Sequence, residues 1–296
     1  MTLTLPPDVN GSILAVSADS PTDAWAVGMW SSTETYIPVL HWDGIAWKLL
    51  RAPGSVYSSF FISVTALSPI NVWALVGGPT QDIMHWNGST WKVYGGSGSS
   101  ISGDSPSDVW TVGGSNGSSI VDHWNGMRWT ATLGPGRALN HVLAFSPTNV
   151  WATYLGSDGV GAAHWDGSTW TVSLFPLPQG GGPDDLRGTP NDLWAVGITV
   201  KDSQLAPLAV HFDGSSWSVT PTPTLPHWAH FTAAVATLGS SEMVFGFQGR
   251  RNLTEKWDGA AWAKIKGPGI GVLAATTIPG TSSAWAVGGG IARYDC

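Results

Sequence analysis

Residues 20–28 read SPTDAWAVG, and this short stretch returns six times along the chain. The copies are SPINVWALVG (68–77), SPSDVWTVGG (105–114), SPTNVWATY (146–154), TPNDLWAVG (189–197), the weaker GSSEMVFGF (239–247) and GTSSAWAVGG (280–289). Self-similarity at a fixed period is the sequence signature of repeat folds. The sequence therefore predicts an array of small, similar units.

A second motif follows each copy of the first. It reads HWDGIAW at 41–47 and recurs as HWNGSTW, HWNGMRW, HWDGSTW, HFDGSSW and KWDGAAW, with a last copy cut short at ARYDC. Its histidine position is occupied by His41, His85, His123, His164, His211, Lys256 and Arg293. The intervals are 44, 38, 41, 47, 45 and 37 residues, so seven units of about 42 residues fill the 296-residue chain.

Each unit has the pattern of four β-strands and shows no helical periodicity. In the first unit the strands are SILAVSA, AWAVGMW, YIPVLHW and WKLLRA, separated by Gly, Pro, Asp, Asn and Ser. Asp-Gly or Asn-Gly between the third and fourth strands is a strong hairpin-turn signal, because glycine accepts positive φ. The pattern predicts an all-β fold, a seven-bladed β-propeller with four antiparallel strands in each blade.

We expect one propeller domain over residues 1–296. The predicted blades cover about 12–52, 60–96, 99–134, 140–175, 184–222 and 231–267, with the last formed by 271–296 together with 2–6. The last copy stops before its fourth strand, and TLTLPP at the start of the chain resembles a fourth strand. We therefore predict that Thr2–Pro6 completes the last blade and closes the ring, which removes an exposed sheet edge.

Composition excludes several classes of protein. The chain carries 13 Lys and Arg against 20 Asp and Glu, a net charge of -7, so we expect no nucleic-acid partner. One cysteine excludes a disulfide scaffold, and 43% hydrophobic residues argue against disorder. There is no run of about 18 apolar residues and no signal peptide at the start, so we expect no membrane insertion. The compartment stays undetermined, and an extracytoplasmic one remains open if the chain is part of a longer protein.

Two motifs carry a resemblance to known propellers. Trp-Asp at the end of the third strand resembles the tryptophan-aspartate repeat propellers, and Asp-Gly-x-x-Trp, as at 43–47, resembles a shortened Asp-box of sialidase-like propellers. DAWAVG followed by the DG..W hairpin also resembles bacterial propellers of the photosystem II assembly-factor type. The resemblance covers the whole chain and implies a propeller. Propellers include lectins, enzymes and adaptors, so it implies no particular activity.

The repeated side chains are expected to be structural. The five repeated histidines lie in different blades and cannot converge on one metal ion, so we expect their rings to bond backbone or the adjacent turn. The turn residue alternates between Asp and Asn, which indicates an acceptor for the turn's own N–H groups. The motifs account for 17 of the 19 tryptophans, which we expect to pack between blades. Only Trp30 and Trp228 fall outside them.

Candidate functional residues are those that depart from the repeat. Most gather on the face that carries the second-to-third-strand loops and the links between blades, where loop lengths vary. Five places before the Ser of the first motif stand Ala15, Ser63, Ser100, His141, Asp184, Ala234 and Ala275, and Asp185 follows at an otherwise mostly apolar position. The predicted ligand-binding residues are Trp30, Tyr36, Tyr57, His141, Asp184, Asp185, Arg187, His227, Trp228 and His230.

Three functions compete at the sequence level. The favoured one is a non-catalytic, monomeric binding propeller that recognises a carbohydrate or a protein around the central funnel, without a cofactor or metal. An enzyme, a hydrolase or lyase, would use His141, Asp184, Asp185 and His230 as acids and bases. A zinc-like ion on His141, Asp184 and His230 is chemically allowed but is not predicted. A structural or sensor domain of a larger protein is the third reading.

Two more specific readings fit the sequence poorly. A sialidase needs an arginine cluster, and only Arg137 and Arg187 are placed to serve a funnel site. Seven equivalent lectin sites would need similar second-to-third-strand loops. Those loops are dissimilar, as in MWSSTETY, GPTQ, GSNGSS and LGSDGVG. We therefore expect one site, or a few unequal ones.

Overall fold

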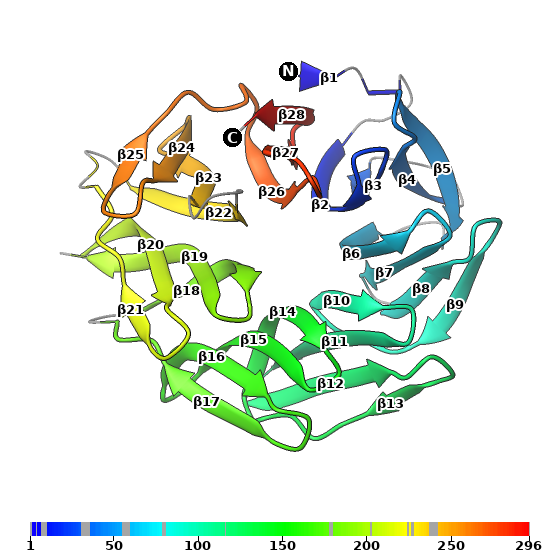
Figure 1. Cartoon of the computed structure of the whole chain (residues 1–296), viewed down its shortest axis with the longest axis horizontal. Coiled ribbons are helices and arrows are strands. Elements are labelled where there is room, and N and C mark those ends of the chain that lie inside the picture. Colours follow the sequence, from blue (N-terminus) through cyan, green and yellow to red (C-terminus); the bar gives the residue numbers. More distant parts are fainter. Residues whose placement is uncertain are drawn as a thin grey trace.

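Seven antiparallel sheets of four strands each follow one another along the chain and form a closed ring in the computed structural model (Figure 1). The structure describes residues 2–3, 5–6, 11–30, 36–54, 60–78, 81–115, 117–177, 180–201, 203–223, 225, 228–236 and 242–295. Within these ranges all regular elements are strands, and no helix is long and apolar enough to span a membrane. The predicted all-β, seven-bladed propeller is confirmed.

Each blade is a simple up-and-down sheet whose first strand lies nearest the centre of the ring. Blade 1 comprises β2 (Gly11–Ser20), β3 (Asp23–Trp30), β4 (Tyr36–Trp42) and β5 (Trp47–Pro53). Blade 2 comprises β6 (Phe60–Ser68), β7 (Asn71–Gly77), β8 (Asp82–Trp86) and β9 (Trp91–Gly95). Blade 3 comprises β10 (Ser100–Ser105), β11 (Asp108–Ser115), β12 (Ser118–Trp124) and β13 (Trp129–Ala131). Blade 4 comprises β14 (Ala138–Ser146), β15 (Asn149–Gly156), β16 (Gly159–Trp165) and β17 (Trp170–Leu174).

The remaining three blades include the one that joins the two ends of the chain. Blade 5 comprises β18 (Gly181–Thr189), β19 (Asp192–Lys201), β20 (Gln204–Phe212) and β21 (Trp217–Val219). Blade 6 comprises β22 (Ala229–Ala236), β23 (Glu242–Gln248), β24 (Arg251–Trp257) and β25 (Trp262–Lys264). Blade 7 comprises β26 (Val272–Thr277), β27 (Ser283–Gly288), β28 (Ile291–Asp295) and β1 (Thr2–Leu3).

The Asp-Gly turns between third and fourth strands hold themselves together, as predicted. In blade 1, Asp43 Oδ1 accepts hydrogen bonds from the backbone N–H groups of Ile45 (3.0 Å) and Ala46 (2.9 Å). Gly44 has φ = 90°, a conformation that costs glycine little. Asn87, Asn125, Asp166, Asp213 and Asp258 accept the equivalent bonds in blades 2 to 6.

Tryptophan side chains pack between neighbouring blades, as predicted. Trp25 of blade 1 is fully buried, and its ring centroid lies 5.9 Å from Trp86 and 6.2 Å from Trp91 of blade 2. Equivalent aromatic contacts occur at the 2/3, 3/4, 4/5, 5/6 and 7/1 interfaces. At the 6/7 interface the buried Met243, which pairs with Lys256, takes the tryptophan's place. Burial of a side chain of this size stabilises the fold by roughly 1.5–3 kcal/mol.

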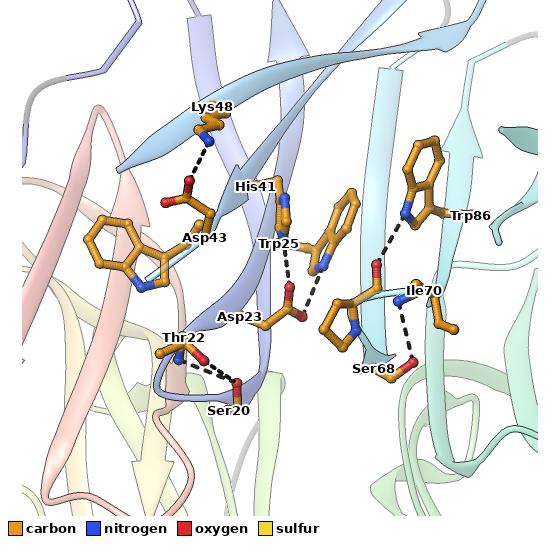
Figure 2. Close-up of polar contacts among 12 residues, drawn as sticks. Ser20, Thr22, Asp23, Trp25, His41, Asp43, Lys48, Ser68, Ile70 and Trp86 are labelled. Carbon is orange, nitrogen blue, oxygen red and sulfur yellow. Dashed lines mark hydrogen bonds and ion pairs between the residues drawn. The ribbon is translucent and has the colours of Figure 1, made fainter. Parts of the chain in front are cut away.

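The repeated histidine binds the Asp or Asn side chain of the first motif, and the expectation that it would bond backbone or the adjacent turn is wrong. His41 Nε2 lies 2.6 Å from Asp23 Oδ1, and its ring stacks on Trp25 at 4.3 Å (Figure 2). Trp25 Nε1 donates to Asp23 Oδ2 at 3.1 Å. The strand pairing explains this arrangement, because it places His41 opposite Trp25 on the neighbouring strand. The same pairs are Asn71–His85, Asp108–His123, Asn149–His164 and Asp192–His211.

The N-terminal strand closes the ring, as predicted. Thr2 pairs with Ala292 and Leu3 with Ile291 in antiparallel register. Leu3 and Leu5 pack on the apolar cluster that joins blades 7 and 1, which includes Trp285. The closing strand therefore supplies both backbone hydrogen bonds and apolar packing to the junction between the two ends.

Deletion of residues 1–7 should lower the melting temperature by roughly 5–10 °C, because it unpairs β28 and removes two leucines from the junction. Differential scanning calorimetry measures this. The double variant Leu3→Ala/Leu5→Ala, which keeps the strand, should show part of the loss. An unchanged melting temperature after the deletion would contradict closure by this strand.

Candidate functional site

A central channel runs between the seven first strands. It has a volume of about 310 Å³, and residues of β2, β6, β10, β14, β18, β22 and β26 line it. We call the face with the second-to-third-strand connections and the links between blades the loop face, and the opposite one the turn face. Most wall residues are small or apolar. The ionisable lining residues all come from blades 4 and 5: His141, Asp184, Asp185 and Arg187.

The inner strands have a free edge, and hydroxyl groups of the preceding blade satisfy part of it. Ser63 Oγ accepts from the Ile101 N–H at 3.2 Å, and Ser100 Oγ accepts from the Val142 N–H at 3.2 Å. Asp185 does the same in blade 5, where its Oδ2 accepts from the Ala234 N–H at 3.0 Å. Asp185 thus occupies a position at which a serine suffices in two other blades.

Strand register corrects the sequence alignment of the two aspartates. Asp185 pairs with Val196 just as Ser63 pairs with Leu75, so Asp185 shares its level of the channel with His141. Asp184 is the extra residue of a β-bulge. The alignment failed because blades 1 to 4 contain a second bulge just before the first-to-second-strand turn, whereas blade 5 has none there. Asp184 therefore does not share the level of His141, and Leu186 fills the apolar position expected for Asp185.

Asp185 and Arg187 connect three blades. Asp185 is 6% exposed, and its Oδ1 accepts the Leu186 N–H at 3.0 Å. Its Oδ2 lies 3.3 Å from Arg187 Nε, and Arg187 Nη2 donates to the Ala275 carbonyl of blade 7 at 3.5 Å. Both oxygens of Asp185 are therefore already engaged by the protein.

His141 faces this ion pair from blade 4. Burial lowers the pKa of its imidazole, the Asp185 carboxylate raises it, and the Arg187 guanidinium lowers it. The lowered pKa favours a neutral ring at pH 7. His141 therefore adds a polar group to the channel wall without adding charge.

Asp184 lies toward the loop face, near an aromatic stack. Asp184 is exposed to solvent at the rim, but the neighbouring channel wall desolvates its carboxyl and thereby raises its pKa. His230 lowers this pKa, and Asp185 raises it. The His230 ring stacks on Trp228 at 5.9 Å and 16°, and it lies tilted by 34° against Phe247 at 5.7 Å. Trp228 is 46% exposed, and its carbonyl accepts the Gly249 N–H at 2.9 Å. The stack therefore presents a fixed aromatic surface to solvent at the rim of blade 6.

The predicted site residues do not all come together. His141, Asp184, Asp185, Arg187, Trp228 and His230 gather on blades 4 to 6. Tyr36 lies in blade 1, where the Arg51 guanidinium sits 4.8 Å from its ring centroid. Tyr57, His227 and the side chain of Trp30 lie outside the described residues. Within the described ranges no three His, Cys, Asp or Glu side chains are close enough to hold a metal ion.

The loop face of blades 4 and 5 also exposes leucines that the sequence analysis did not single out. Leu155, Leu174 and Leu205 lie at the loop-face ends of β15, β17 and β20 and are 47–54% exposed. Leu155 Cδ1 approaches Gly182 of blade 5, where a Cβ would lie 3.7 Å away. Leu155 therefore faces blade 5, whereas Leu174, which precedes Phe175 of the cluster between blades 4 and 5, lies on the other face of blade 4.

Two buried carboxyls in blade 6 were also missed. Glu242 is 3% exposed and Glu255 is fully buried, at positions that hold apolar residues in blade 1. Burial raises the pKa of Glu255 to about 7, and Lys264 partly opposes this shift. Burial also raises the pKa of Glu242 well above its usual value, aided by Asp192 and Asp185 and opposed by Arg187. The weak repeat at 239–247 was the only signal in the sequence.

Asp185→Ser should cost about 1 kcal/mol of unfolding free energy, because its hydroxyl can still accept the Ala234 N–H. Asp185→Leu should cost about 2–4 kcal/mol, because it leaves that amide and Arg187 without their partner. Urea unfolding of both variants measures this. Equal losses would contradict the assignment of Asp185 to the edge of blade 6.

Glu255 should make the protein less stable as pH rises. Its pKa is about 7 in the folded state against 4.5 in the unfolded chain, so its contribution is lost between these pH values. Glu255→Gln should reduce the fall in unfolding free energy between pH 5 and 8 by up to about 3 kcal/mol. The control is Asp213→Asn, whose pKa of about 2 lies outside this range. An unchanged slope in Glu255→Gln would refute the shift.

Comparison with known proteins identifies the fold. No protein-family model and no curated protein matches the chain. Among solved structures, YCF48 bound to D1 peptide is 15% identical with a TM-score of 0.70, covering 100% of this chain and 94% of that one. The RRP9 WD40 repeats are 12% identical with a TM-score of 0.71, covering 100% and 96%. The SapL1 lectin in complex with alpha methyl fucoside is 14% identical with a TM-score of 0.56, covering 87% and 96%. The chain is a seven-bladed β-propeller, similar in fold to WD40 and other propeller proteins.

Proposed function

We propose that the chain is a non-catalytic binding propeller that recognises a polypeptide segment of a partner protein on the loop face of blades 4 to 6. The observation that carries this proposal is Trp228. Its ring is nearly half exposed, yet stacking on His230 and the backbone bond to Gly249 hold it in place. Rigid, exposed tryptophans supply much of the binding energy in protein interfaces, because they bury a large area at low entropic cost.

The exposed leucines favour a polypeptide over a sugar as the ligand. Leu155 and Leu205, at the loop-face ends of β15 and β20, add exposed apolar side chains to blades 4 and 5. Exposed apolar side chains on the same loop face as an exposed tryptophan favour a protein ligand, whereas a sugar would use a single aromatic ring and polar groups. The solved structure of YCF48, a propeller of similar fold, is a complex with D1 peptide, which supports this type of ligand.

Carbohydrate recognition is the second candidate, and the exposed face of Trp228 favours it. A flat ring beside the carboxyl of Asp184 is suited to stacking on a sugar and accepting its hydroxyl groups. The SapL1 lectin in complex with alpha methyl fucoside is similar in fold, which supports this alternative.

Catalysis by His141, Asp184, Asp185 and His230 has less support. Asp185 accepts two backbone N–H groups and contacts Arg187, so a substrate would have to compete with these partners for its oxygens. General acid–base catalysis needs a group with free access to the reacting proton. The absence of nucleic-acid binding and a monomeric state remain predictions of this proposal.

The test compares wild type with Trp228→Ala. A phage-displayed library of random peptides and a glycan array are applied to both, with Met127→Ala on the turn face as the control for loss of an exposed apolar side chain. We expect peptides that bind wild type and the control, with about tenfold or greater loss for Trp228→Ala.

Two outcomes would overturn the proposal. If only glycans bind and depend on Trp228, the carbohydrate alternative replaces it. If neither ligand class shows binding that depends on Trp228, this surface is not the binding site. Melting curves of the variants check that any loss of binding does not arise from unfolding.

A further inference from the structure

Positive charge is concentrated in one blade of an acidic protein. Blade 6, residues 229–268, holds five of the chain's 13 basic residues: Arg250, Arg251, Lys256, Lys264 and Lys266. Blades 1, 3, 4 and 5 hold more acidic than basic residues, and blades 2 and 7 are balanced. This uneven distribution is unexpected for a repeat, because the other six blades form the same fold without an excess of basic residues.

The acidic residues of blade 6 do little to offset this charge at the surface. Glu242 and Glu255 are buried. Burial raises the pKa of both carboxyls, which favours their neutral, protonated form. The third, Asp258, lies at the turn face, where it holds the N–H groups of Ala260 and Ala261. The residues of blade 6 itself therefore give its loop-face end a positive charge, and Asp184 of blade 5 is the acidic group that faces it through His230.

Three of the cations lie at this loop-face end, beside Trp228. Arg250, in the connection between β23 and β24, and Arg251, the first residue of β24, are both exposed. The preceding Gly249 bonds the Trp228 carbonyl at 2.9 Å, which joins this connection to the tryptophan. The exposed Lys264 donates from Nζ to Gln248 Oε1 at 3.1 Å, at the end of β23. Among the described residues neither arginine has an ion-pair partner, whereas Arg137 and Arg187 pair with Asp158 and Asp185.

We infer that the partner segment is acidic, and that Arg250, Arg251 and Lys264 bind its carboxylates while Trp228 packs against a neighbouring apolar side chain. This inference rests on the proposed polypeptide-binding function and specifies the ligand of the same surface. Arginine suits the role because its planar guanidinium binds a carboxylate through two parallel hydrogen bonds.

The rest of the surface directs such a ligand to blade 6. The chain carries a net charge of -7, so an acidic segment is repelled by most of the ring and attracted at the basic end of blade 6. The attraction extends over a Debye length of about 8 Å at physiological ionic strength. Binding of the acidic segment should therefore weaken as the salt concentration increases. The direction in which the segment lies on the loop face should depend on charge as well as on shape.

The composition of the peptides selected by the display experiment is the first readout. Peptides that bind wild type and require Trp228 should be enriched in Asp and Glu. Binding of one such peptide, labelled with fluorescein and followed by anisotropy, should weaken at least tenfold in Arg250→Glu/Arg251→Glu and should weaken with added sodium chloride. The matched control is Lys92→Glu/Arg128→Glu on blades 2 and 3, which makes the same charge change elsewhere and should bind within about twofold of wild type.

The outcomes separate this inference from the proposed function. The inference of an acidic partner would be overturned if the Trp228-dependent peptides were not enriched in Asp and Glu, or if the two double variants lost equal amounts of peptide affinity. Either result would leave the proposed polypeptide binding intact. No Trp228-dependent peptide at all would overturn both. Alginate and oligo(dT) serve as anionic probes of other chemistry. Binding of either that matches the peptide's affinity and needs the same two arginines would overturn an acidic polypeptide as the ligand.

Discussion

Each blade must bury two apolar sheet faces, and only its two neighbours can cover them. Trp25 meets this requirement at the first interface by extending from blade 1 between Trp86 and Trp91 of blade 2. Asp23 holds the indole N–H, and His41 covers the ring while it binds the same carboxylate (Figure 2). The ring can be stable only when it is closed, because an open array would leave one apolar face uncovered at each end. Closure therefore makes the packing of every blade depend on the junction at β1.

Closing the ring brings seven free strand edges to the centre, where backbone N–H groups need partners. Serine hydroxyls at 63 and 100 provide acceptors in two blades, and Asp185 provides one in blade 5. A carboxylate in place of a hydroxyl brings a charge into the channel, and Arg187 balances that charge. The polar residues of the channel thus largely serve the fold. The parts left available for a ligand are Asp184 at the rim and the exposed stack of Trp228 on His230.

Blade 6 departs furthest from the repeat, in both its interior and its surface. Met243 and Lys256 replace the repeated tryptophan and histidine in this blade, and Glu242 and Glu255 are buried in it. Burial raises the pKa of both carboxyls, so we expect the stability of this blade to depend on pH. The same blade carries the exposed cations beside Trp228. Departures from a repeat are expected where residues serve another role, which supports the proposal that this blade carries the binding surface.

The sequence alone determined the number of blades, their strands, their Asp-Gly turns and the packing role of the tryptophans. Those features depend on local patterns that recur seven times, so each copy confirms the others. Only the tertiary structure showed that His41 binds Asp23, that Asp185 shares the level of His141, and that Gly249, next to Arg250, bonds the Trp228 carbonyl. These relations depend on strand register and on the position of single bulges. One extra residue in a strand shifts all the pairings beyond it, and a periodic sequence pattern does not reveal where that residue is placed.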